Sequence, residues 1–222
     1  MKKTNLSAAF TLIELLVVIS IIAILAGIAA PVYTAAMLNA RIMKSVADAR
    51  QIGVALRMYA QDNDGLFPKD KNDYNEEINT SNDAFRSLIP TYLDSESIFT
   101  VPTSKAGSKA DNKIATAADI LDRGENHWAY ISGLSSSSNS SWPLVVDHSD
   151  GSGFYGDKET EFGGTWKGTK GIVIRTDNSA GAVKLLGTGS KRYIPRFDDR
   201  SKNTLQVKDY MGDGAKLLEP AR

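Results

Sequence analysis

The chain of 222 residues contains no cysteine. No disulfide bridge can therefore stabilise the fold, and no lipid can be attached through a cysteine as in a lipoprotein anchor. Because cysteine-free proteins occur in both reducing and oxidising compartments, this absence does not by itself indicate where the protein resides.

A surplus of positive charge is also absent, since 26 lysines and arginines balance 26 aspartates and glutamates. Proteins that bind nucleic acids usually gather basic side chains on one face. No such cluster is visible in the sequence, and we therefore expect no nucleic-acid partner.

Histidine is scarce, with only His127 and His148, and they lack the His-x-x-x-His spacing of a zinc site. The pair Asp147-His148, taken with the many serines, resembles parts of a hydrolase triad. However, the chain has no Gly-x-Ser-x-Gly elbow, and a triad is recognised by geometry rather than by adjacency. We expect both histidines to be structural or solvated, in strand-edge or loop positions. We expect no enzymatic activity and no required cofactor.

The most prominent feature that the sequence does contain is one long apolar segment near the N-terminus. Residues 15–30 carry Ser20 as their single polar side chain. A helix over residues 10–30 would be about 31 Å long, which is enough to cross the hydrocarbon core of a bilayer. Lys2 and Lys3 precede it without any acidic residue, so the positive-inside bias predicts a cytoplasmic N-terminus.

The unusual residue in this segment is Glu14, because a charge at the centre of a bilayer costs about 2.5–3.5 kcal/mol. A cut between Ala9 and Phe10 would create an α-amine whose ordinary pKa is about 8. That amine would lie one helical turn from Glu14, or beside the Glu14 of a neighbouring helix, and would offset much of the burial cost. The alternative is a solvated carboxylate in the headgroup zone, at a helix end.

The string Phe10-Thr11-Leu12-Ile13-Glu14 resembles the N-terminal motif of the type IV pilin and pseudopilin family. The resemblance implies that a prepilin peptidase removes residues 1–9 and that Phe10 is then N-methylated. It also implies that Glu14 docks subunits and that Pro31 kinks the helix. One departure is Ala9, where the family normally has glycine.

Two other interpretations of the N-terminus are an ordinary signal peptide, cleaved near Gly27-Ile28-Ala29, and a plain membrane anchor. Both leave Glu14 unexplained. The helical pattern also continues beyond Pro31, where apolar residues recur at spacings of three and four, which favours the prepilin interpretation.

The predicted fold is α+β and pilin-like, with a long N-terminal helix packed on a small antiparallel sheet. The helix should end at residues 62–65, a cluster of turn-forming residues. A short helix is expected over 82–89 with Ser81 as N-cap, and strands over 128–132, 144–147, 171–175 and 182–186. The expected domains are a leader (1–9), a transmembrane half-helix (10–30), an amphipathic half-helix (31–64), a periplasmic globular domain (65–186) and a tail of uncertain structure (187–222).

Two kinds of binding site are suggested by composition or resemblance. Major pseudopilins of type II secretion hold calcium near their C-terminal strands, and Asp147, Asp150 and Asp157 lie in a corresponding glycine-rich stretch. The same residues are also typical of a solvated turn. Three tryptophans with neighbouring tyrosines could line a carbohydrate groove or anchor the core: Trp128, Trp142, Trp166, Tyr130 and Tyr155.

The resemblance implies a structural subunit of a type II secretion or type IV pilus-like filament. The implied partners are the peptidase, further copies of the chain, the inner membrane, and an inner-membrane assembly platform with its secretion ATPase. The alternatives are a true type IV pilin for adhesion, motility or DNA uptake, a minor or tip pseudopilin, and a membrane-tethered carbohydrate-binding module.

Overall fold

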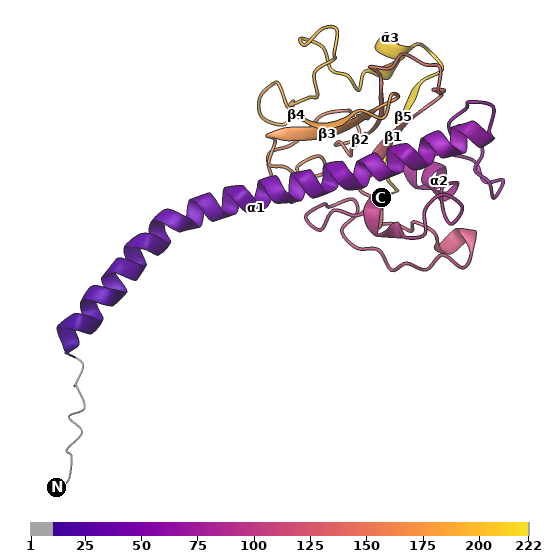
Figure 1. The fold of residues 1–222 in the computed structure, drawn as a ribbon. Helices are drawn as coiled ribbons and strands as arrows, with labels where there is room; N and C mark the ends of the chain where they lie inside the picture. The colour runs from indigo at the N-terminus through magenta and orange to yellow at the C-terminus, as the bar shows by residue number, and fades with distance from the viewer. Residues whose placement is uncertain (1–10, 222) are drawn as a thin grey trace. The chain divides into compact units, whose positions relative to one another are not determined.

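The computed structural model describes residues 11–221, which divide into two compact units at Arg41 and Ile42 (Figure 1). The helix α1 (Leu12–Asp62) contributes to both units, and everything after it belongs to the second. The remaining elements are α2 (Ser81–Arg86), η1 (Glu96–Phe99), η2 (Ala117–Asp119), β1 (Trp128–Ser132), β2 (Pro143–Asp147), β3 (Lys170–Arg175), β4 (Ala180–Lys184), α3 (Val207–Met211) and β5 (Lys216–Leu218).

Within the second unit, one face of α1 is buried. Ile42, Ala49, Ile52 and Leu56 are at most 2 % exposed and recur at helical spacing. The helix ends as predicted at Asp62, because Gly65 adopts a φ of 79° and donates its N–H to the carbonyl of Ala60. This left-handed glycine satisfies a carbonyl that the helix leaves unpaired.

The sheet has five strands in the order β4-β3-β2-β1-β5, and each neighbouring pair is antiparallel. Every residue of β1 and β2 is buried, so both faces of the sheet centre are covered. On one face Gly53 of α1 packs against the Ile174 side chain, and on the other Gly171 packs against Ile194. The α+β fold with a long N-terminal helix and an antiparallel sheet is confirmed.

The four predicted strands form within two residues of their expected bounds, but the C-terminal segment was missed. β5 pairs with the C-terminal half of β1, in a register that places Tyr130 opposite Leu218 and Ser132 opposite Lys216. Residues 187–222 thus contribute an edge strand of the sheet. A three-residue strand is too short to show a period in sequence, and its pairing partner lies far along the chain.

The short helix α2 begins one residue earlier than expected. Thr80, rather than Ser81, is its N-cap, and the Thr80 hydroxyl accepts from the Asp83 N–H while the Asp83 carboxylate accepts from the Thr80 N–H. Ser81 is fully buried and donates its hydroxyl to the carbonyl of Trp128, which ties α2 to β1. The reciprocal capping pair is what fixes the start.

Most of the aromatic residues considered for a carbohydrate groove lie in the core. Trp128, Tyr130, Tyr155 and Trp166 are each at most 2 % exposed, so they cannot line an open binding surface. Burial raises the pKa of the Tyr155 hydroxyl well above its ordinary value, with a further contribution from the charge of Asp147. The groove interpretation is wrong for these four residues, which serve as packing anchors.

Candidate functional site

The first turn of α1 is organised by a reciprocal pair of hydrogen bonds. Thr11 donates its backbone N–H and its hydroxyl to Glu14 Oε2, at 2.8 and 2.7 Å. The Glu14 N–H in turn approaches Thr11 Oγ1 at 3.3 Å. Thr11 is therefore the N-cap of α1 and Glu14 the third helical residue, which is the arrangement of a capping box.

The capping box gives Glu14 a local role that the sequence interpretation overlooked. The pattern Thr-x-x-Glu before an apolar run is itself a sequence signal for a helix start. It was present in Thr11-Leu12-Ile13-Glu14 and could have been recognised there. A carboxylate in the first turn also faces the positive end of the helix dipole, so this position is electrostatically favourable for an acid.

Beyond Glu14, the first unit presents apolar side chains on all sides of the helix. Among the described residues, α1 alone is long and apolar enough to span a membrane, and its most apolar window has no buried residue. An apolar helix that is exposed all round needs a lipid or protein environment. The exposed side chains are Leu12, Ile13, Leu15, Leu16, Val17, Val18, Ile19, Ile21, Ile22, Ile24, Leu25, Ile28 and Val32.

The other predicted residues of this segment are placed as follows. Ala9 and Phe10 lie outside the described residues, so cleavage and methylation stay predictions. Pro31 lies inside α1, and the helix continues on both sides of it without a melted turn. The Thr34 hydroxyl donates to the Pro31 carbonyl at 2.9 Å. A kink at Pro31 stays a prediction.

A family described as the prokaryotic N-terminal methylation motif matches residues 4–30. The chain therefore carries the N-terminal motif of type IV pilin-like prepilins. The matched segment contains the capped helix start and most of the exposed apolar helix, so sequence and geometry single out the same part of the chain. No curated protein and no solved structure matches the chain.

The prepilin motif carries two consequences beyond the fold. It implies processing by a prepilin peptidase and assembly into pilus-like machinery. Together with the exposed apolar helix, it also fits anchoring in a membrane. The globular unit of the chain lies outside the matched residues and is therefore described from its own geometry.

The three aspartates considered for calcium are not gathered by the fold. Asp147 is buried, and both of its oxygens accept hydrogen bonds from protein groups. Asp150 accepts from the backbone of its own turn, and Asp157 lies 3.5 Å from Arg192 in an exposed ion pair. The described residues contain one group of at least three close carboxylates, and it includes none of these aspartates. The calcium site predicted at Asp147, Asp150 and Asp157 is therefore wrong.

Asp147 belongs instead to a buried polar network. Its carboxylate accepts from His127 Nε2 at 2.7 Å, from Trp166 Nε1 at 2.8 Å and from the Ile172 N–H. His148 Nε2 accepts from the Gly163 N–H at 3.0 Å, which leaves the proton of a neutral imidazole on Nδ1. That nitrogen lies 3.2 Å from His127 Nδ1. The two rings therefore form a series of hydrogen bonds that ends at the Asp147 carboxylate.

The network includes a Ser104–His127–Asp147 line, yet it is not arranged for hydrolysis. Ser104 Oγ lies 2.8 Å from His127 Nδ1, but it also accepts from the Ala106 and Gly107 N–H groups. All three side chains are buried, with exposures of 6 %, 0 % and 1 %. A nucleophile without access to substrate cannot act. His127 directly precedes β1 and His148 directly follows β2, at strand edges as predicted. Both are buried, which agrees with a structural role and not with a solvated one.

Proposed function

We propose that the chain is a pseudopilin-like structural subunit of a periplasmic filament, of the type II secretion or type IV pilus-like kind. The observation that supports this most strongly is the match of the N-terminal methylation motif to residues 4–30. Within this match, residues 12–30 lie in α1, whose apolar side chains are exposed there and whose first turn carries Glu14.

Before assembly, the subunit is held in the inner membrane as a single-pass protein. Lys2 and Lys3 favour a cytoplasmic N-terminus, and the globular domain then lies in the periplasm. Removal of residues 1–9 takes both lysines away and exposes the Phe10 amine. After this cut, the positive charge of the new Phe10 amine can pair with the negative charge of Glu14.

During assembly, the apolar half-helices of successive copies pack against one another. Apart from its chain neighbours and the adjacent backbone of α1, no atom lies within 4 Å of the Cβ position of Gly27, so a neighbouring helix could approach its backbone closely. Small residues allow helices to associate closely in an apolar medium. Contacts between unlike surfaces of identical copies propagate as an open filament unless their rotation closes a ring. The small residues are Ala23, Ala26, Gly27, Ala29 and Ala30.

The proposed role is structural and not enzymatic. The Ser104–His127–Asp147 line, which most resembles catalytic machinery, is buried, and its Ser104 hydroxyl oxygen accepts from two backbone N–H groups. The energy for assembly would come from partner proteins, namely an inner-membrane platform and its secretion ATPase.

Filament formation can be tested by chemical cross-linking of whole cells that express the full chain with an assembly machinery. We expect a ladder of cross-linked multimers that requires the prepilin peptidase and the ATPase. The matched control is the same strain without the ATPase, in which the ladder should vanish while the amount of processed chain stays constant. A chain that stays monomeric with all components present would refute the proposal.

A further inference from the structure

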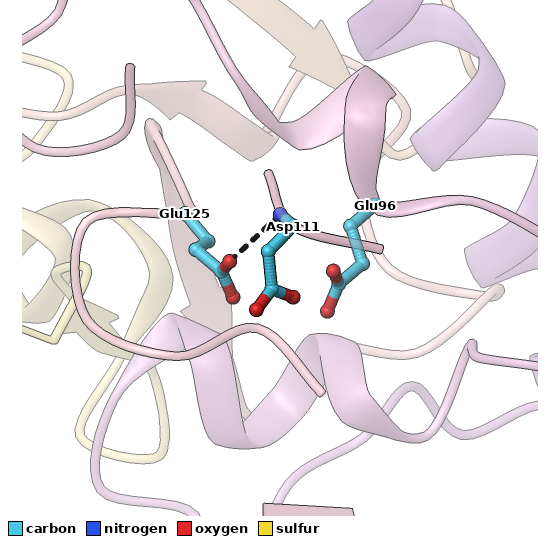
Figure 2. A group of neighbouring side chains, drawn as sticks. All are labelled: Glu96, Asp111 and Glu125. Atoms are coloured by element: carbon cyan, nitrogen blue, oxygen red, sulfur yellow. Dashed lines mark hydrogen bonds between the residues drawn. The ribbon is translucent and has the colours of Figure 1, made fainter. Parts of the chain in front are cut away.

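Three carboxylates converge in the long segment between α2 and β1. Glu96 lies at the start of η1, Asp111 in the following loop, and Glu125 just before β1 (Figure 2). One oxygen from each side chain lies within 4.8 Å of the others. Three like charges at this distance repel one another, so their convergence requires a compensating group.

Backbone groups hold two of these side chains in place. Glu125 accepts the Asp111 N–H at 2.9 Å on one oxygen and the Asp122 N–H at 2.7 Å on the other. Glu96 Oε1 accepts the Leu121 N–H at 2.6 Å. The two glutamates are thus fixed by the chain around them, and their orientation is not an accident of flexible surface side chains.

The second oxygen of Glu96 provides an independent observation. Glu96 is 0 % exposed, and its Oε2 is buried without any hydrogen-bond partner. Figure 2 shows its carboxylate directed toward Asp111. Burial raises the pKa of Glu96, the Leu121 hydrogen bond lowers it, and the charges of Glu125 and Asp111 raise it further. A buried carboxylate oxygen without a partner is costly unless a cation or a proton satisfies it.

Lys113 lies beside the group, but its charge is not enough to neutralise the three carboxylates. Lys113 Nζ lies 2.6 Å from Asp111 Oδ2, and the Lys113 N–H donates to Asp111 Oδ1. Lys113 is 72 % exposed and pairs with the outermost of the three acids. Its single charge leaves two negative charges uncompensated, and those belong to the buried glutamates.

We propose that Glu96, Asp111 and Glu125 bind a calcium ion. An all-oxygen, all-carboxylate set favours a hard cation over zinc, which prefers nitrogen and sulfur ligands. Two ligands on opposite sides of Ca²⁺ lie about 4.6–5.2 Å apart, against about 4.0–4.2 Å across Mg²⁺. The three carboxylate oxygens lie within 4.8 Å of one another, which is close enough for all three to contact one Ca²⁺. The Asp111 side chain is 43 % exposed, so water can supply the remaining ligands.

The bound ion would join three stretches of chain that have little regular structure. Only η2 interrupts the loops between η1 and β1. Calcium would provide a partner for Glu96 Oε2. It would also link η1 to the segment that leads into β1. The site lies wholly within the second unit, so its calcium binding can be measured without filament assembly.

The test is thermal unfolding of the full chain in detergent, with calcium chloride, with magnesium chloride and with a chelator. Calcium should raise the midpoint, and magnesium should raise it less. Glu96→Gln and Asp111→Asn should each weaken calcium affinity at least about tenfold, measured by calorimetric titration, because each removes a ligand charge. In chelator, Glu96→Gln should be at least as stable as the parent, since it removes a buried charge.

The control variant is Glu77→Gln, which changes an exposed glutamate outside the group and should keep the full calcium response. Trypsin cleavage after the exposed Lys109 and Arg123 should slow in calcium. An absence of calcium binding by the parent chain would overturn the proposal, and would show that a proton satisfies Glu96. Undiminished binding by Glu96→Gln would also overturn it, because the ion would then lie elsewhere.

Discussion

Replacing Glu14 with glutamine should abolish filament assembly while the start of α1 stays intact. Glutamine can accept the Thr11 hydrogen bonds that Glu14 accepts at 2.8 and 2.7 Å, because a capping box tolerates either residue. It cannot neutralise the Phe10 amine of a neighbouring copy, and an unpaired charge in an apolar interface is strongly destabilising. We expect cross-linked multimers to fall by more than about tenfold, since a loss of 1.4 kcal/mol already corresponds to tenfold.

The matched control is Thr11→Val, which removes the capping hydroxyl and keeps the acid. A lost cap costs about 1 kcal/mol of helix stability, and this variant should still assemble. Both variants should remain in the membrane fraction, because the apolar helix is unchanged. Normal multimers from Glu14→Gln, or loss of multimers from Thr11→Val alone, would show that Glu14 acts as a helix cap and not as a docking charge.

Asp147→Ala should unfold the globular unit more readily than any exposed substitution. The change leaves the His127 Nε2–H, the Trp166 Nε1–H and the Ile172 N–H without their acceptor. Each buried unsatisfied donor costs about 1–3 kcal/mol, so the free energy of unfolding should fall by roughly 3 kcal/mol or more. Urea denaturation of the full chain in detergent, followed by tryptophan fluorescence, measures this loss.

Asp157→Ala is the matched control, because Asp157 comes from the same predicted calcium set but is exposed. Its contact with Arg192 spans 3.5 Å, and Asp157 is 51 % exposed. Exposed ion pairs contribute about 0–1 kcal/mol, so this variant should unfold near the parent midpoint. Equal losses for Asp147→Ala and Asp157→Ala would contradict the network described for the core.

Local patterns in the sequence predicted the features that depend on neighbouring residues. The apolar run, the end of α1 at Asp62 and the motif around Glu14 are of this kind. The strands β1 to β3 were also predicted closely, because their residues form short apolar runs between turn-forming stretches.

Features that depend on distant contacts escaped prediction. β5 becomes a strand only because β1 offers it an edge. Asp147 was predicted to bind calcium because its hydrogen-bond partners, His127 and Trp166, lie far from it in the sequence. The carboxylates of Glu96 and Glu125 are brought together by folding of the intervening loops, and no sequence spacing encodes them. The Thr11–Glu14 cap was different, since its signal was local.

The most direct test of the central claim is intact-mass and terminal-peptide mass spectrometry of the chain purified from membranes that contain a prepilin peptidase. The account predicts a mature protein that begins at Phe10, carries a methyl group on its α-amine, and retains the whole apolar helix with Glu14. A chain that still begins at Met1, or one that begins near Ala30 after loss of that helix, would contradict it.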